Sequence, residues 1–196
     1  MKYNYKNKKE IIHMLEKIFR NRNSIIISGG NTIKDLLKDY KHKIFCKKIL
    51  LSDERLVKKN SNLRNDKFFK SLIKKKIIKH KQLINYNYQE LDEKKINTFS
   101  NKVSKLKFDY ALLSLGSNGH FASIFKINNT KKNFYSIKNS PKYPKRRVTL
   151  SLNKISKCKK IFFLASRKNK KNEVLNFQKY KLIKKLPKNK TFLYTF

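Results

Sequence analysis

The stretch FDYALLSLGSNGHFASIF, residues 108–125, joins the most apolar run of the chain to its most reactive short motif. Its segment Tyr110–Leu115 is apolar apart from Ser114, which is typical of a short strand buried on both faces. The strand ends at the turn Gly116–Gly119, and His120 follows at once. In an open α/β sheet this turn would present backbone N–H groups and the His120 imidazole at the carboxyl end of a central strand, where such sheets bind ligands. The alternative is that the glycines only form a tight turn and that His120 caps the next helix.

Length and composition set the broad class. A chain of 196 residues is long enough for a real hydrophobic core, and we expect residues 1–196 to form a single domain. No apolar run approaches the roughly 20 residues of a membrane span, and the N-terminus lacks the apolar core of a signal peptide, so we expect a soluble, cytoplasmic protein with no membrane partner. Cys46 and Cys158 lie far apart without ligand spacing, which indicates core thiols.

The charge balance is strongly basic, with 51 Lys and Arg against 12 Asp and Glu, a formal net charge of +39. Such a charge ordinarily indicates a nucleic-acid or membrane-surface partner. Here the lysines are spread from end to end and accompany an excess of Ile and Asn, so compositional bias is the simpler explanation and no specific nucleic-acid partner is expected. The positive field should still attract a phosphorylated substrate and polyanions in general.

A candidate phosphate-binding loop follows an early strand. Ser24–Ser28 is a buried strand by its β-branched residues, and it leads through Gly29, Gly30, Asn31 and Thr32 into a helical pattern. Glycines allow close backbone approach to a ligand, and the first N–H groups of a helix attract anions. The loop is a weak signal alone, because it has neither the dinucleotide-binding nor the Walker spacing.

A second strand, Lys48–Ser52, ends in Asp53, Glu54 and Arg55. Two adjacent acids at the end of an apolar strand are unexpected in a chain with so few acids, which favours a functional role. Arg55 adds a planar guanidinium suited to phosphate.

The remaining pattern alternates helices with strands. An amphipathic helix is predicted over Asn7–Arg20, a short helix from Phe121 to Phe125, a polar loop over Asn128–Lys138, and strands at Arg146–Leu152, Lys160–Ser166 and Thr191–Phe196. This alternation predicts a single-domain α/β fold of the doubly wound, Rossmann-like kind, with a mostly parallel sheet and helices on both faces.

Five blocks in this order resemble the 6-phosphogluconolactonase family: IIISGGNT, LSDERLV followed by NSN, LLSLGSNGHFASIF, SPKYPKRRVTLSL and IFFLAS. The resemblance covers Ser24 to Leu175. It implies a doubly wound fold that hydrolyses 6-phospho-glucono-1,5-lactone, a small phosphosugar lactone, to 6-phosphogluconate in the oxidative pentose phosphate pathway, without a metal or another cofactor. Related deaminases carry an acid shortly after the histidine, and this chain has none between His120 and Phe125.

The resemblance also implies roles for individual residues. His120 matches the histidine that activates the attacking water, and Asp53 matches an acid that could orient a sugar hydroxyl or the water. An imidazole with an ordinary pKa near 6.5 suits general-base work. The residues implied for substrate and phosphate binding are Gly29, Gly30, Asn31, Thr32, Arg55, Gly116, Gly119, Arg147 and Lys170, with Lys171 as an alternative to Lys170.

Three departures from the family pattern temper this assignment. Asn118 stands where the family usually has Asp, so we expect Asn118 to leave His120 less basic than in relatives. Arg167 replaces a family glycine, and the chain is shorter than the family at both ends. Two alternatives therefore stay open: an impaired relative that binds phosphosugars or polyanions, and a sugar-phosphate deaminase or isomerase of the same superfamily. No feature of the sequence indicates an oligomeric state.

Overall fold

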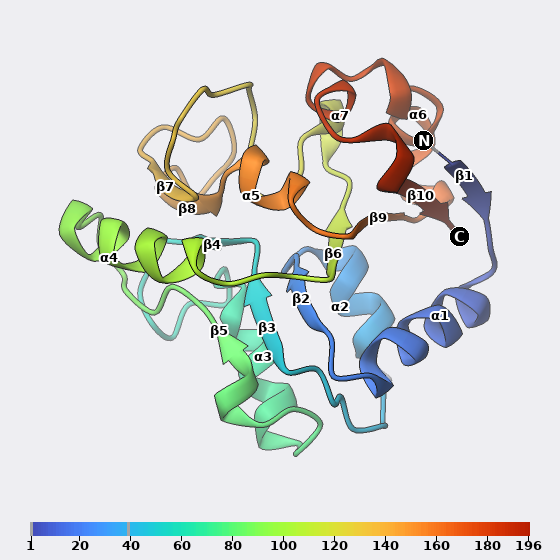
Figure 1. Ribbon diagram of the computed structural model, residues 1–196, viewed down its shortest axis with the longest axis horizontal. Helices are drawn as coiled ribbons and strands as arrows, with labels where there is room; N and C mark the ends of the chain where they lie inside the picture. Colours follow the sequence, from blue (N-terminus) through green and yellow to red (C-terminus); the bar gives the residue numbers. More distant parts are fainter. Residues whose placement is uncertain (1, 39) are drawn as a thin grey trace.

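Seven strands form one parallel sheet in the computed structural model, which describes residues 2–38 and 40–196 (Figure 1). In order across the sheet they are β1 (Lys2–Tyr5), β10 (Thr191–Thr195), β9 (Lys160–Ala165), β6 (Tyr110–Ser114), β2 (Ser24–Ile27), β3 (Lys48–Leu51) and β5 (Leu83–Ile84). Each pair of neighbours runs parallel. From β2 the chain builds the sheet outward through β3 to β5, then returns to β6 on the other side of β2. The predicted doubly wound, mostly parallel sheet is confirmed, with its switch point between β2 and β6.

Helices cover both faces of this sheet. The side chains of Ile25 and Ile27 pack on one face with residues of α1 (Lys8–Arg20), α2 (Asn31–Leu37) and α3 (Asp66–Lys74). Ile26 points to the other face, where α4 (Glu93–Ser104), α5 (Leu152–Ser156), α6 (Arg167–Leu175) and α7 (Lys181–Lys184) contribute to a second cluster. Short 3₁₀ turns are η1 (His80–Gln82), η2 (Ser117–Gly119), η3 (Phe177–Lys179) and η4 (Lys188–Lys190). Residues of β2 alternate between two cores because successive side chains of a strand point to opposite faces.

A small antiparallel sheet stands beside the large one and was not predicted. It consists of β4 (Asp53–Arg55), β8 (Arg147–Leu150) and β7 (Phe134–Ile137), in that order. The predicted strand at Arg146–Leu152 therefore exists but lies outside the parallel sheet. Its register with β4 places Arg55 opposite Arg147, and Asp53 opposite Thr149. The small sheet thus gathers three of the predicted site residues at the carboxyl end of β3.

Two local predictions were wrong. Phe121–Phe125 forms a turn, not a helix, because Ala122 has a φ of 51° and a residue at positive φ cannot continue a right-handed helix. The predicted polar loop Asn128–Lys138 contains β7, which pairs with β8. A third difference is β1, an unpredicted strand that pairs with β10 ahead of the predicted helix α1.

Two other expectations of the sequence are met, the first helix and the buried cysteines. The helix α1 begins after Asn7, whose side chain accepts from the Glu10 N–H at 2.9 Å while the Glu10 carboxylate accepts from the Asn7 N–H. Cys46 and Cys158 are buried free thiols. Over the ranges 2–38 and 40–196, the helices are all too short or too polar to cross a bilayer.

Candidate active site

A cavity of about 310 Å³ opens at the carboxyl ends of β2 and β6, at the switch point of the sheet. Nine of the twelve predicted site residues line it: Gly30, Asn31, Thr32, Asp53, Arg55, Gly116, His120, Arg147 and Lys170. The other three, Gly29, Asn118 and Gly119, are not among its lining residues. Segments up to 142 residues apart in the chain, from Ser28 to Lys170, therefore meet at one end of the sheet.

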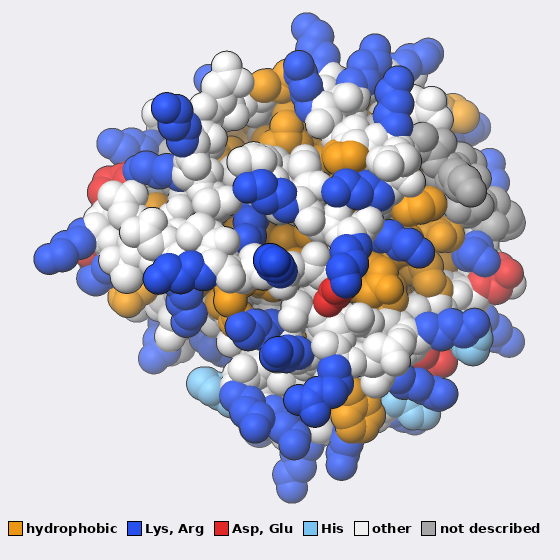
Figure 2. Space-filling view, viewed as in Figure 1, with side chains coloured by type: hydrophobic (Ala, Val, Ile, Leu, Met, Phe, Trp, Pro, Cys, Tyr) orange, Lys and Arg blue, Asp and Glu red, His pale blue; other side chains and the backbone are white. Residues whose placement is uncertain are grey.

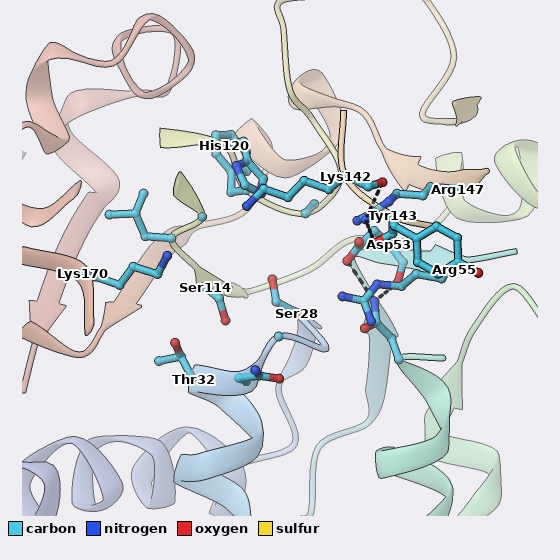
Figure 3. Close-up of a pocket in the computed structure, with 17 residues that line it drawn as sticks. Ser28, Thr32, Asp53, Arg55, Ser114, His120, Lys142, Tyr143, Arg147 and Lys170 are labelled. Carbon is cyan, nitrogen blue, oxygen red and sulfur yellow. Dashed lines mark hydrogen bonds between the residues drawn. The ribbon is translucent and has the colours of Figure 1, made fainter. Parts of the chain in front are cut away.

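The charged side chains surround this cavity. Figure 3 shows His120 and Lys142 on one side, with Ser28 and Thr32 facing them, Arg55 and Arg147 at one end, and Lys170 at the other end. Asp53 is the single carboxylate among the lining residues of the described chain. The cavity is therefore suited to an anionic ligand with hydroxyl groups.

The His120 imidazole is held in one orientation. Its Nδ1 lies 2.6 Å from the carbonyl oxygen of Ser117, and a carbonyl can only accept, so Nδ1 carries the proton. Its ring packs against the Phe125 ring with centroids 4.7 Å apart. In the neutral imidazole this leaves the Nε2 lone pair free to accept a proton.

Burial lowers the pKa of His120 below its ordinary value of 6.5. The Ser117 carbonyl and the more distant Asp53 raise the pKa, whereas the positive charges of Lys142 and Arg147 lower it further. The net direction is downward, so the imidazole is mostly neutral at pH 7. A neutral, oriented histidine is the state that general-base catalysis needs.

The turn before His120 leaves space for the imidazole ring. A Cβ added to Gly116 would lie 2.2 Å from Cε1 of the His120 ring, so only glycine leaves room for the imidazole. Gly119 has a φ of 73° and sits against the Tyr180 ring. Asn118, at φ 58°, is exposed, and the Nδ1 partner of His120 is the Ser117 carbonyl rather than the Asn118 side chain. The Ser117 carbonyl therefore sets the tautomer of His120.

Asp53 is a buried carboxylate with a fixed orientation. Its Oδ1 accepts from Ser52 Oγ at 3.0 Å and from Asn65 Nδ2 at 3.3 Å, and its Oδ2 accepts from Ser123 Oγ at 2.6 Å. Ser28 Oγ lies 3.2 Å from Ser52 Oγ and extends the chain of hydroxyls to the cavity wall. The carboxylate is therefore held rigidly and can accept from a ligand hydroxyl without first reorganising.

Glu54, the neighbour of Asp53, points away from the cavity and organises the start of α3. Its carboxylate accepts from the backbone N–H groups of Arg55, Asn65 and Asp66 at 2.7 to 2.8 Å. Burial raises the pKa of Glu54 to about 7, because its effect is larger than that of these hydrogen bonds, which lower the pKa. By holding Asn65, Glu54 places the amide that bonds Asp53. Gly29 completes this arrangement, because an added Cβ would lie 2.3 Å from the Asn65 side chain.

Three cations line the cavity with at least part of their donor groups engaged by neighbouring residues. Arg55 donates from Nη1 to the Leu63 carbonyl at 2.7 Å, and its buried Nε has no hydrogen-bond partner among the described residues. Lys142 donates to Ser117 Oγ at 2.6 Å, and Lys170 lies 3.5 Å from Glu173. Burial lowers the pKa of Lys142, as do the charges of Lys170 and Arg147. An anion in the cavity would relieve this repulsion.

Arg147 holds the chain that covers the site. Its Nε donates to the Pro144 carbonyl at 2.9 Å, and Nη2 donates to the carbonyls of Lys142 and Tyr143 at 3.2 and 3.0 Å. Nη1 donates to Ser123 Oγ at 3.4 Å. Most of its donors therefore serve segment 142–144, which carries Lys142 to the cavity, and Tyr143 lies at the mouth with 76 % of its surface exposed.

Sequence reasoning missed several lining residues, notably Ser28, Asn65, Ser114, Lys142 and Tyr143. The two prolines that flank Lys142 and Tyr143 signalled a fixed segment, but nothing in the sequence indicated that it turns into the site. Asn65 carried no signal. Of the two candidate lysines, Lys170 lines the cavity, whereas Lys171 is exposed and is not among the lining residues.

Among residues 2–38 and 40–196, no three His, Cys, Asp or Glu side chains are grouped in a way that could hold a metal ion.

Comparisons with known proteins place this site in context. The sequence pattern of one family, described as glucosamine-6-phosphate isomerases/6-phosphogluconolactonase, matches residues 5–189. A 6-phosphogluconolactonase of Borreliella burgdorferi is 30% identical over 169 residues, which covers 79% of this chain and 72% of that protein.

Solved structures agree on the fold. A 6-phosphogluconolactonase of Thermotoga maritima superimposes with a TM-score of 0.81 at 20% identity, covering 99% of this chain and 98% of the other. A monomeric glucosamine-6-phosphate deaminase superimposes with a TM-score of 0.75 at 14% identity, covering 100% of this chain and 97% of the other. Since proteins with both names share the fold, the fold alone does not select between the two reactions.

Proposed function

Because the chain belongs to the family of glucosamine-6-phosphate isomerases and 6-phosphogluconolactonases, as its motifs predicted, we propose that it hydrolyses 6-phospho-glucono-1,5-lactone to 6-phosphogluconate. This reaction belongs to the oxidative pentose phosphate pathway. The observation that supports it best is a neutral, oriented His120 in a cavity that has four cations and one carboxylate among its lining residues. We further propose that residues 1–196 act as one domain, since the lining extends from Ser28 to Lys170.

In this mechanism His120 is the general base. Its Nε2 accepts a proton from a water molecule as the water oxygen attacks the lactone carbonyl carbon. The tetrahedral intermediate then collapses, the bond from the carbonyl carbon to the ring oxygen breaks, and the imidazolium returns the proton to that oxygen. The Ser117 carbonyl accepts from Nδ1 throughout, so it keeps the tautomer and stabilises the transient imidazolium. The products are a hydroxyl and a carboxylic acid, which releases its proton to solvent at pH 7 and becomes the carboxylate of 6-phosphogluconate, and no other reactant is needed.

The cations and the buried acid recognise different parts of the substrate. Arg55 and Lys142 bind the phosphate, because both have charged ends at the cavity, and Lys170 approaches from the opposite end (Figure 3). Arg147, expected from the sequence to bind phosphate, acts chiefly through the 142–144 segment that it holds. Asp53 accepts from a sugar hydroxyl. The loop Gly30–Thr32 closes the cavity beneath the ligand.

The residues after His120 favour lactone hydrolysis over deamination. Phe121, Ala122 and Ser123 offer no carboxylate to serve an amine, and Ser123 is committed to Asp53 and Arg147. Asp53 is also the single lining carboxylate of the described chain.

A direct assay separates the candidates. Stopped-flow measurement of freshly made 6-phosphogluconolactone should show hydrolysis well above its spontaneous rate, whereas glucosamine 6-phosphate should release no ammonia. Ammonia release would instead support a deaminase. Binding of 6-phosphogluconate without any acceleration of hydrolysis would indicate an impaired relative.

A further inference from the structure

A second cavity lies at the opposite end of the strands from the candidate active site. It has a volume of about 940 Å³ and is lined by two segments, residues 43–48 and 76–82, together with Arg22 and Ile73. These segments lead into β3 and β5, so the groove lies at the amino ends of the strands, whereas the candidate active site lies at the carboxyl ends. We call it the amino-end groove. None of its lining residues belongs to the site described above.

The groove is basic beyond the average of the chain. Seven of its fifteen lining residues are Lys or Arg, about one in two, against 51 of 196 in the whole sequence, about one in four. His80 adds an eighth basic side chain, and neither Asp nor Glu lines the groove in the part of the chain that the structure describes. Across residues 2–38 and 40–196 none of the seven cations forms an ion pair. Figure 2 shows Lys and Arg side chains crowded around a small apolar area at the lower edge of the molecule, below β3.

An exposed aromatic ring lies among these cations. Phe45 lines the groove with 55 % of its surface exposed, between the buried residues Ile44 and Cys46. The segment is fixed: the Phe45 N–H donates to the Phe19 carbonyl at 2.7 Å, and Gln82 Nε2 donates to the carbonyls of Ile44 and Cys46. The Phe45 ring is therefore held outward by a rigid backbone, not exposed on a loose loop.

From this combination we infer that the amino-end groove binds single-stranded nucleic acid. A cationic groove follows a phosphate backbone, and an exposed aromatic ring offers a surface on which an unstacked base can lie. A duplex keeps its bases stacked and gives the ring no partner. A bilayer surface is too flat to enter a concave groove, and an acidic peptide would use the lysines but not the ring.

The test measures affinity for a fluorescent, single-stranded oligonucleotide of about ten nucleotides, as oligouridylate RNA and as oligothymidylate DNA, by anisotropy at several salt concentrations. Phe45→Ala should weaken binding about five-fold or more, and Phe45→Trp should restore it. The triple variant Lys43→Ala/Lys79→Ala/Lys81→Ala should reduce the slope of log affinity against log salt by about 2, from about 0.7 for each lost phosphate contact. Comparison of the two probes identifies the preferred strand.

The matched control is Lys94→Ala/Lys102→Ala/Lys105→Ala, which removes the same charge from exposed positions on or next to α4. It should leave both the affinity and the salt slope near those of the unaltered protein, and no groove variant should change lactone hydrolysis. Equal losses in the two triple variants, or an unchanged affinity for Phe45→Ala, would overturn the proposal and leave only nonspecific attraction. Tighter, Phe45-dependent binding of polyglutamate or of phosphatidylserine vesicles would overturn it in favour of those partners.

Discussion

The two ends of the parallel sheet are both cationic, but they are built differently. At the carboxyl ends, donors of Arg55, Lys142 and Arg147 are oriented by hydrogen bonds around a buried carboxylate and a neutral histidine. At the amino ends the lysines form no ion pairs among the described residues, all of them but the half-buried Lys48 are exposed, and the fixed feature is the Phe45 ring. Holding a long side chain in one orientation costs conformational entropy, and at the carboxyl ends hydrogen bonds to backbone carbonyls and a hydroxyl offset that cost. The comparison teaches that net charge alone does not show which ligand a site binds. The groups that surround and orient the charged side chains are more informative.

The largest expected effect is on the rate of lactone hydrolysis, which should depend on a histidine at the carboxyl ends of the strands and not on one at the amino ends. His120→Ala should reduce the rate of lactone hydrolysis about 10²- to 10⁴-fold, because it removes the general base while the turn keeps its shape. Stopped-flow rates together with circular dichroism check this. The matched control is His80→Ala in the amino-end groove, which should hydrolyse the lactone like the unaltered protein. Near-normal turnover by His120→Ala would remove this residue from the mechanism.

Two glycine substitutions test whether turnover depends on the position of the His120 ring. Gly116→Ala should lower turnover about 100-fold, since its Cβ would lie 2.2 Å from the His120 ring and must displace it. Gly30→Ala should have a much smaller effect, because an added Cβ would lie 3.0 Å from Ser114 Oγ, the nearest atom outside the adjoining residues, and a shift of a few tenths of an ångström relieves that contact. Similar losses in both variants would show that the position of the imidazole is not what Gly116 protects.

Phosphate recognition should depend on oriented cations alone. Arg55→Met should raise KM for 6-phosphogluconolactone about 10- to 150-fold, from charge-assisted hydrogen bonds worth about 1.5 to 3 kcal/mol, and should barely change KM for unphosphorylated gluconolactone. Arg22→Met removes the same charge at the amino-end groove and should leave both values unchanged. Equal increases for the two lactones would mean that Arg55 does not bind the phosphate.

A smaller effect concerns the pKa of His120. Removing the nearby charge with Lys142→Met should raise this pKa, so the acid limb of the pH–rate profile moves to higher pH, whereas Lys142→Arg should keep it in place. The measured quantity is the midpoint of kcat against pH at saturating lactone. A midpoint unmoved by Lys142→Met would show that the two groups are not coupled.

The smallest expected effect is that of Asn118→Asp, which should raise the same midpoint less than Lys142→Met does. Asn118 is exposed, so solvent screens the new charge, and Ser117 already holds Nδ1 of His120. The same titration measures it. A shift larger than that of Lys142→Met would restore the stronger role that the sequence suggested for this position.

The strands of the large sheet were predictable where they are continuous apolar runs, as at Ile25–Ile27 and Ile161–Ala165. Strands β1 and β7 were missed because KYNY and FYSI are short and partly polar, and only pairing with β10 and β8 makes them strands. Likewise the turn at Ala122 depends on a backbone angle that no residue type dictates.

The candidate site was predictable where a motif follows a strand, as for Gly30, Asp53 and His120. Asn65 was not, because it reaches Asp53 only through the bonds that Glu54 makes to the start of α3. The prediction that Arg147 binds phosphate rested on the family resemblance of the block RRVTLSL, which does not reveal the hydrogen bonds of its side chain. Its carbonyl partners, three to five residues earlier in the chain, appear only when the segment folds back.

The central claim is that a neutral His120 activates water at the carboxyl end of the sheet. The most direct measurement is kcat/KM for 6-phosphogluconolactone across pH, corrected for spontaneous hydrolysis. A base must be unprotonated to act, and burial lowers the pKa of His120, so activity should rise through a single midpoint below 6.5, reach a plateau near pH 7, and fall as the pH drops through that midpoint. A profile without this limb, or the same limb in His120→Ala, would contradict the account.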